Sequence, residues 1–185
     1  MHSQQDLVRD CLRGDPRAQR ALYDTYAEVM LGVCCRYVRT QADAEDVLQE
    51  AFVRVFTRLG QYRGSGELGG WIRRIVVHTA LNFLKRPSRI HEPLSFAEEG
   101  PEPVSDLDPV PDLEAKELAA LIRSLPAGFR TVFNLYAIEG YSHAEIAKLM
   151  NIRETTSRSQ YLRARAALAE MIRRHHAATS QKQSP

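Results

Sequence analysis

The stretch QYRGSGELGGWIRRIVVHTALNFLKR, residues 61–86, reads as a glycine-rich loop that leads into a basic amphipathic helix. At about 100° per residue, its apolar side chains fall on one side of the helix and its polar side chains on the other. Two interpretations are open: an ordinary surface helix with a charged outer face, or a surface that binds unpaired DNA. We predict an inner side of Ile72, Ile75, Val76, Thr79 and Phe83, and an outer side of Trp71, Arg74, His78, Asn82 and Lys85.

The loop ahead of this helix favours the second interpretation. Tyr62 and Arg63 stand at its start. Single strands are held by stacking of bases on aromatic rings and by neutralisation of phosphates, and these two residues supply both. Because glycine adopts many backbone conformations, we expect a mobile loop backbone from Gly64, Gly66, Gly69 and Gly70.

The composition of the whole chain allows one domain or two small ones. It has 185 residues, of which 44% are hydrophobic. Its net charge of +2 is unevenly distributed: residues 1–87 carry 13 Lys/Arg and 10 Asp/Glu, residues 88–113 carry 1 and 7, and residues 114–185 carry 11 and 6. Two basic blocks on either side of an acidic connector predict two surfaces for a polyanion.

The cysteines and the N-terminus indicate a cytoplasmic protein. Cys11, Cys34 and Cys35 lack the spacing of a zinc site and fit a reducing compartment, so we assign them to the core. The first ten residues contain no apolar signal segment, and no apolar run reaches the roughly 18 residues that span a bilayer. We therefore expect no membrane insertion, and we predict no cofactor.

The N-terminal half reads as helices. We predict helix over residues 5–35 with a turn at 14–16, where Pro16 can begin a helix. A further helix follows, with Asp43 as its cap and an apolar stripe of Val47, Leu48, Ala51, Phe52, Val55 and Phe56. Its outer face carries Glu45, Asp46, Gln49 and Glu50, which suggest either a partner-facing edge or, less simply because no His or Cys joins them, a metal site.

Residues 87–112 divide the chain, because they hold six of its nine prolines and seven acidic residues. Beyond them we predict helices over 113–125 and 129–136, the second ended by Gly140. Ser142 and Glu145 form a capping-box pattern at the start of a short helix, and a basic helix follows over 154–174.

A short helix, a tight turn and a longer basic helix predict a helix-turn-helix, whose second helix enters the major groove of DNA. The alternative is a surface helix of a bundle. In the second helix we predict that Tyr161, Ala164, Leu168 and Ile172 point inward, and that Thr155, Arg158, Ser159, Leu162 and Arg163 point outward.

Over about residues 5 to 172, the chain resembles bacterial sigma factors of the extracytoplasmic-function (ECF) type in the sigma-70 family, which have two conserved domains called regions 2 and 4. The resemblance rests on several motifs in the order of the family. They are DAEDVLQEAF at 43–52, YRGS at 62–65, WIRRIVVHTALN at 71–82, LPAGFRTVFNLY at 125–136 and EGYSHAEIA at 139–147.

The resemblance implies an all-α protein of two small helical domains joined by an acidic, proline-rich linker. Region 2 would occupy residues 1–87, the flexible linker 88–112, region 4 residues 113–175, and a disordered tail 176–185. The implied function is promoter selection and opening of the −10 region, with no enzymatic activity. The implied partners are the clamp coiled coil of core RNA polymerase, promoter DNA and an anti-sigma factor, and the free protein is expected to be a monomer.

The resemblance also assigns roles to residues. The polymerase contacts would be Asp46, Gln49 and Glu50. The −10 element would meet Tyr62, Arg63, Trp71, Arg74, His78 and Asn82, with one extruded base near Tyr62 and Arg63. The −35 element would meet Thr155, Arg158, Ser159, Leu162 and Arg163.

The chain departs from the family pattern at several positions. Tyr62-Arg-Gly-Ser stands where Phe-Arg-Gly-Glu is usual, and Gly69-Gly70 replaces a more polar pair. Arg153 and Thr155 stand in place of a usual serine cap and glycine, and Ser157 takes an inward position that valine commonly holds. From these we expect a slightly less stable second domain.

Two other classes of protein are alternatives to this one. A helix-turn-helix repressor or response-regulator output domain would leave the glycine-rich loop and Trp71 without a role. A metal-dependent hydrolase would use Asp43, Glu45, Asp46 and Glu50.

Overall fold

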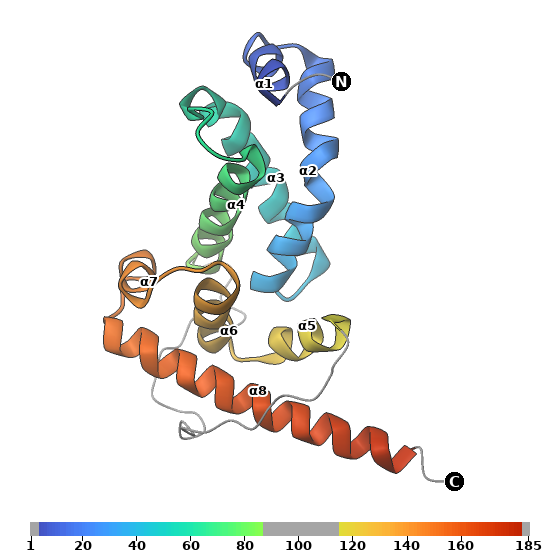
Figure 1. Cartoon of the computed structure of the whole chain (residues 1–185), viewed down its shortest axis with the longest axis vertical. Coiled ribbons are helices and arrows are strands. Elements are labelled where there is room, and N and C mark those ends of the chain that lie inside the picture. Colours follow the sequence, from blue (N-terminus) through green and yellow to red (C-terminus); the bar gives the residue numbers. More distant parts are fainter. Residues whose placement is uncertain (1–3, 87–114, 183–185) are drawn as a thin grey trace. The chain divides into compact units, whose positions relative to one another are not determined.

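The computed structural model describes residues 4–86 and 115–182, and every regular element in these ranges is helical (Figure 1). The chain divides into two compact units, Met1–Ile90 and His91–Pro185. The prediction of an all-α fold is confirmed. The predicted linker, 88–112, lies outside the described residues.

The described part of the N-terminal unit, residues 4–86, contains four α-helices: α1 (Gln4–Leu12), α2 (Pro16–Tyr37), α3 (Gln41–Arg58) and α4 (Leu68–Leu84), with a short 3-10 turn, η1 (Leu59–Gln61), after α3. Helices α2, α3 and α4 pack against one another, and α1 packs on α2 (Figure 1). The interior of this unit is apolar and includes Leu22, Val33, Val47, Phe52, Ile72 and Val76.

Local signals explain where these helices begin. Pro16 is the first residue of α2, and the Asp15 carboxylate accepts a hydrogen bond from the Arg17 N–H at 2.8 Å. The predicted cap of α3 is wrong, because Thr40 is the N-cap and its hydroxyl accepts from the Asp43 N–H at 3.0 Å. Asp43 lies within the first turn, where its carboxylate accepts a hydrogen bond from the Thr40 hydroxyl.

The glycines after η1 have two different structural roles. Gly64 and Gly66 have φ of 71° and 94°, a region that glycine enters at little cost. Gly69 and Gly70, predicted as loop, instead lie in the first turn of α4. At Gly69 the reason is a close approach, because a Cβ there would lie 3.2 Å from Cε1 of Tyr26.

The C-terminal unit contains α5 (Ala115–Ser124), α6 (Ala127–Phe133), a π-helical turn η3 (Asn134–Ile138), α7 (His143–Met150) and α8 (Glu154–Lys182). Helix α8 continues past the predicted end at Arg174 into the segment that we expected to be a tail. The apolar cluster of the C-terminal unit comprises Ile122, Leu125, Phe129, Ala164, Ala167 and Leu168.

The turn after η3 confirms two predictions. Gly140, at φ 78°, ends this helical segment, and the Tyr141 N–H donates to the Leu135 carbonyl at 2.9 Å. Ser142 and Glu145 then form the predicted capping box at the start of α7. Asn151, in the left-handed region at φ 55°, ends α7 and leads into α8.

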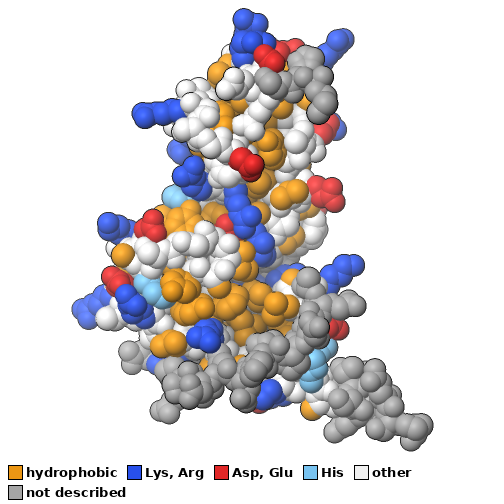
Figure 2. Space-filling model, in the orientation of Figure 1, with side chains coloured by type: hydrophobic (Ala, Val, Ile, Leu, Met, Phe, Trp, Pro, Cys, Tyr) orange, Lys and Arg blue, Asp and Glu red, His pale blue; other side chains and the backbone are white. Residues whose placement is uncertain are grey.

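Apolar side chains gather on one face of the C-terminal unit (Figure 2). Five of its hydrophobic side chains are only partly buried against the core: Leu118, Leu121, Phe133, Ile138 and Met171. In the N-terminal unit Cys11 and Cys34 are buried as predicted, whereas Cys35 is half-buried. None of the described helices combines the length and hydrophobicity needed to cross a bilayer.

Candidate nucleic-acid interface

A groove of about 350 Å³ lies between α3 and α4. Three arginines, one histidine and the tryptophan surround it, and the two helices share them. Its lining is Arg54 and Arg58 from α3, and Trp71, Arg74, Ile75, His78 and Thr79 from α4. A basic groove with an aromatic ring is the combination by which proteins hold single-stranded nucleic acid.

The outer face predicted for α4 is confirmed as exposed at Arg74, His78 and Asn82, while Trp71 is half-buried. Asn82 is exposed but does not line the groove. Sequence reasoning missed Arg54 and Arg58, although their spacing of four residues places them on one face of α3.

His78 is a weaker base in this groove than a free imidazole. Burial lowers the pKa of the imidazole below its usual value, and the nearby charges of Lys85, Arg58 and Arg74 lower it further. The positive charge of the groove therefore comes from its arginines. A phosphate in the groove would favour the protonated form of His78.

Tyr62 joins the loop to the groove. Its ring lies 5.7 Å from that of Trp71, centroid to centroid. Its hydroxyl accepts a hydrogen bond from Nε2 of Gln4 at 2.7 Å and donates to the Gly66 carbonyl at 2.6 Å. These bonds fix the ring and close the loop, so that Tyr62 is half-buried while Arg63 is exposed.

A second hollow, of about 440 Å³, lies between α1 and the loop, and Tyr62 forms part of its lining. Its lining combines an apolar floor with arginines, and it consists of Gln5, Val8, Arg9, Leu12 and Arg13 from α1, and Tyr62, Arg63 and Gly64 from the loop.

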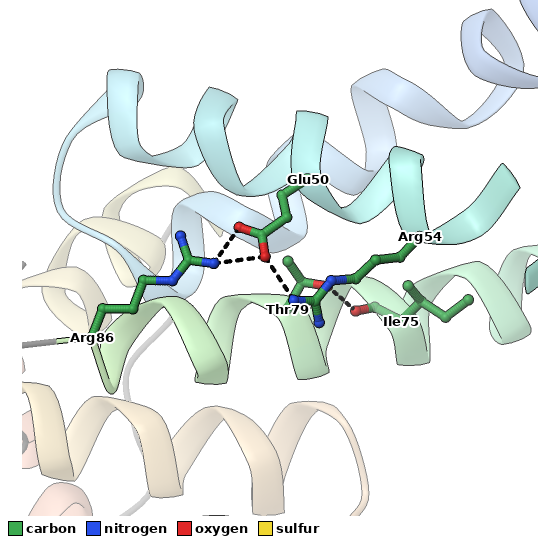
Figure 3. A network of polar contacts seen from close by, with 5 residues as sticks. All are labelled: Glu50, Arg54, Ile75, Thr79 and Arg86. Carbon is green, nitrogen blue, oxygen red and sulfur yellow. Dashed lines mark hydrogen bonds and ion pairs between the residues drawn. The ribbon is translucent and has the colours of Figure 1, made fainter. Parts of the chain in front are cut away.

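The acidic face of α3 divides into two parts. Asp46 and Gln49 are exposed as predicted. Glu50 is half-buried instead, and Figure 3 shows its carboxylate between two arginines: both oxygens accept from Nη2 of Arg86 at 2.7 Å, and Oε1 also accepts from Arg54 at 2.7 Å. Glu50 thus ties α3 to the residues that follow α4.

The residues predicted on the outward face of α8 also differ in their exposure. Thr155, Arg158 and Leu162 are exposed, with 40% of Leu162 accessible. Arg158 forms an ion pair with Glu154 at 2.5 Å, and its side chain stays 61% exposed. Ser159 is half-buried and donates its hydroxyl hydrogen bond to the Thr156 carbonyl at 3.0 Å.

Arg163 does not have the outward position that we predicted for it. It is half-buried, and its Nε and Nη1 atoms are enclosed without a hydrogen-bond partner among the described residues. Tyr161, predicted as inward, is also half-buried. The helical period gives the direction of a side chain but not how far the neighbouring helices cover it.

The inward serine of α8 has a specific partner. Ser157 is fully buried, and its hydroxyl lies 2.9 Å from Nδ1 of His143, the first residue of α7. The His143 ring stacks on Tyr136 at 4.2 Å with an interplanar angle of 10°. Burial lowers the pKa of His143 below its usual value, and Arg158 adds to this lowering against the opposing charge of Glu154.

The metal-site interpretation finds no support in the described part of the chain, where no three His, Cys, Asp or Glu residues group as metal ligands would. This includes Asp43, Glu45, Asp46 and Glu50. Burial raises the pKa of the Cys34 thiol to about 12, so that the free side chain stays protonated at neutral pH.

Comparison with known families matches the two units to two regions of the same protein family. Residues 22–90 match the family model of sigma-70 region 2, and residues 115–168 match that of sigma-70 region 4. The chain is 33% identical to the RNA polymerase sigma-H factor of Pseudomonas aeruginosa over 91% of its own length and 93% of that protein.

Further relatives agree with this match. The chain is 32% identical to the ECF RNA polymerase sigma-E factor of Escherichia coli, over 91% of the chain and 93% of that protein. Among solved structures it is similar to the sigma factor RpoE of Bartonella quintana, crystallised in complex with the anti-sigma factor NepR. That likeness has a TM-score of 0.52 and 15% identity, and it covers 83% of the chain and 96% of RpoE.

Proposed function

The chain belongs to the ECF sigma factors of the sigma-70 family, and from this premise we propose that it is a promoter-specificity subunit of RNA polymerase in the cytoplasm. Its own residues bind and position DNA, while the polymerase performs the chemistry. The observation that carries the proposal is the α3–α4 groove, where three arginines and Trp71 surround one channel.

The groove holds the strand that becomes unpaired in the −10 region. Arg54, Arg58 and Arg74 neutralise its phosphates, and Trp71 offers a ring to a base. Extrusion of a base costs a few kcal/mol, and stacking recovers roughly 1–3 kcal/mol per base. Because these magnitudes are comparable, captured bases can hold the strand open without ATP hydrolysis.

The exposed face of α8 meets the −35 element as duplex DNA. Arg158, Leu162 and Thr155 form this face, and an arginine and an apolar tip can read a guanine and a thymine methyl. Ser159 and Arg163 lie at its edge. The partial burial of Arg163 supports a backbone contact or a packing role better than a bidentate contact with guanine.

Asp46 and Gln49 provide the contact with core polymerase on the exposed side of α3. Glu50, which is engaged with Arg54 and Arg86, acts within the chain and supports this surface indirectly. An anti-sigma factor that covers these surfaces would hold the free monomeric protein inactive, as the complex of RpoE with NepR suggests.

Run-off transcription tests the proposal. Core polymerase mixed with this chain should transcribe from promoters identified by sequencing the transcripts that rise when the chain is overexpressed. Core polymerase alone, or with the variant Asp46→Arg/Gln49→Arg, should not. A chain that binds the same promoters but never activates core polymerase would instead be a helix-turn-helix repressor.

A further inference from the structure

The ion-pair network of Glu50, Arg54 and Arg86 lies beside the α3–α4 groove, and one of its members, Arg54, lines that groove. We propose that Glu50 is a positioning residue for strand capture, which holds the guanidinium of Arg54 ready for a phosphate of the opened strand. The inference rests on the proposed function and deepens it, because it names the residue that orients one of the three arginines in the groove.

The bond between Glu50 and Arg54 leaves part of the guanidinium available. Glu50 lies one helical turn before Arg54 on α3, and their side chains are 27% and 30% exposed. A glutamate four residues ahead of a basic residue is the favourable order for such a pair. The bond uses Nη2 of Arg54, and a guanidinium carries further N–H groups on Nε and Nη1. Those N–H groups can bind a second acceptor while Glu50 holds the first.

Arg54 is held where α3 and α4 meet. Figure 3 shows its side chain reaching from α3 toward Ile75 and Thr79 of α4, and all three residues line the groove. The Thr79 hydroxyl donates to the Ile75 carbonyl at 2.8 Å. Among the described residues, Glu50 is the acidic partner that fixes Arg54 at this place.

Arg86 in turn fixes the Glu50 carboxylate. It follows α4, and its Nη2 donates to both carboxylate oxygens at 2.7 Å. Its guanidinium carbon also lies 5.6 Å from the centroid of the Phe83 ring, within the range of a cation–π contact. Because these contacts restrict Glu50, the carboxylate that orients Arg54 is itself oriented.

The network stays attractive to phosphate, because two guanidinium groups share one carboxylate. Arg58 and Arg74 differ from Arg54: both are exposed, and neither forms an ion pair with another described residue. A mobile arginine loses side-chain freedom when it binds a phosphate, whereas Glu50 has already ordered Arg54. Such preorganisation strengthens binding by lowering the entropy lost on binding.

Glu50→Gln tests the inference by the sign of its effect. The substitution removes a negative charge beside the groove, so a groove that acts only through its net charge would bind DNA more tightly. Glutamine has one acceptor oxygen and no charge with which to hold both arginines. In holoenzyme at one fixed salt concentration, the ratio of the affinities for fork-junction and duplex promoter DNA should therefore fall roughly 3- to 10-fold.

Two variants of α3 separate position from charge. Glu50→Asp keeps the charge but shortens the side chain, so it should lower the ratio in the same direction. Glu45→Gln is the matched control, because it removes an exposed acidic side chain of α3 that does not line the groove, and it should keep the wild-type ratio. A wild-type ratio in both Glu50 variants, or an equal fall in Glu45→Gln, would overturn the inference.

A double substitution shows whether Glu50 acts through Arg54. Arg54→Gln should lower the ratio, and Glu50→Gln added to it should lower the ratio no further. Losses that add would show that Glu50 acts independently of Arg54. Thermal unfolding of each variant checks that the fold is retained.

The affinity of each variant for core polymerase is measured separately. If Glu50→Gln weakens core binding and keeps the wild-type ratio, Glu50 contacts the polymerase and the inference is wrong, while the proposed function stands. If wild-type holoenzyme binds fork-junction DNA no better than duplex, the proposed function itself is wrong.

Discussion

The two units have different interiors. Among the described residues of the N-terminal unit, the buried side-chain hydroxyls are those of Tyr37 and Thr79, and the Thr79 hydroxyl donates to the Ile75 carbonyl of its own helix at 2.8 Å. The described part of the C-terminal unit buries six polar side chains: Arg130, Thr131, Asn134, His143, Ser157 and Gln160.

This difference matches what each unit presents to DNA. Apolar contacts have no preferred direction, and they suffice to hold α3 and α4 together while the outer faces of both helices form a groove. In the proposed function the C-terminal unit reads duplex DNA with one helix, whose position must be set more exactly. Buried hydrogen bonds such as His143 to Ser157 are directional, so they set the position of α8 relative to α7.

Removal of Arg130 should have the largest effect and should be confined to the C-terminal unit. Nη1 of Arg130 donates to the carbonyls of Arg123 and Leu125, both at 3.0 Å, and so closes the turn between α5 and α6. Arg130→Ala leaves two acceptors unpaired and a cavity, so we expect a loss of about 3 kcal/mol in the unfolding free energy of this unit.

Denaturant unfolding monitored by amide hydrogen exchange separates the two units. Arg123→Ala is the control, because it removes an exposed side chain from the same turn and keeps the carbonyl. An equal loss of unfolding free energy in both variants would show that the buried hydrogen bonds of Arg130 do not stabilise this unit.

A pair of substitutions compares the two interiors directly. Ser157→Ala removes the partner of His143, and we expect a loss of about 1–2 kcal/mol in unfolding free energy. Thr79→Val removes a hydroxyl that bonds only within its own helix, so its loss should stay below about 0.5 kcal/mol. Equal losses, measured by the same exchange experiment, would contradict the proposed difference between the units.

Acid should destabilise the C-terminal unit through His143. Its pKa in the folded protein lies below the unfolded value of about 6.5, so the unfolded state binds more protons as the pH falls. The free energy of unfolding of this unit is therefore highest above about pH 6.5, with respect to His143, and it decreases as the pH falls below that value. The groups that face the imidazole are Ser157, Tyr136, Tyr161 and the Arg158–Glu154 pair.

Unfolding measured between pH 7.5 and 5.5 tests this dependence. His143→Asn can keep a hydrogen bond to Ser157 without a titrating group, and it should flatten the pH profile. His78, whose pKa is also lowered, lies at the surface of the N-terminal unit and should contribute less. A profile that His143→Asn leaves unchanged would assign the pH dependence to other groups.

The smallest effect should come from two neighbouring glycines in α4. Gly70→Ala places a methyl group where no atom lies within 4 Å, so it should stabilise the N-terminal unit by about 0.4–1 kcal/mol. Gly69→Ala brings a Cβ to 3.2 Å from Tyr26 and should give no such gain. If thermal unfolding shows the same gain for both, the contact with Tyr26 does not restrict Gly69.

The sequence predicted those features that depend on one helix. The outward direction of Arg74, His78 and Arg158 followed from the helical period, and the capping box of α7 followed from the spacing of Ser142 and Glu145. These features need no knowledge of how the helices pack.

The sequence did not predict features that depend on contacts between two segments of the chain. Arg54 and Arg58 join the groove only because α3 packs beside α4. Glu50 accepts a hydrogen bond from Arg86, which lies 36 residues later in the sequence. The sequence shows only that Glu50 is acidic, and this suggested a side chain that faces a partner. The π-helical turn η3 also has no signal of its own in the sequence, yet it contains Tyr136, which stacks on His143.

The central claim is that the α3–α4 groove holds the opened strand, and permanganate footprinting of holoenzyme at its promoter tests it most directly, because permanganate oxidises unpaired thymines. For Trp71→Ala and Arg58→Ala we expect closed complexes at wild-type occupancy and permanganate reactivity reduced by roughly 5- to 100-fold. Arg20→Ala, which removes an exposed arginine on α2 outside the groove, should behave as wild type. Wild-type reactivity in both groove variants would contradict the claim.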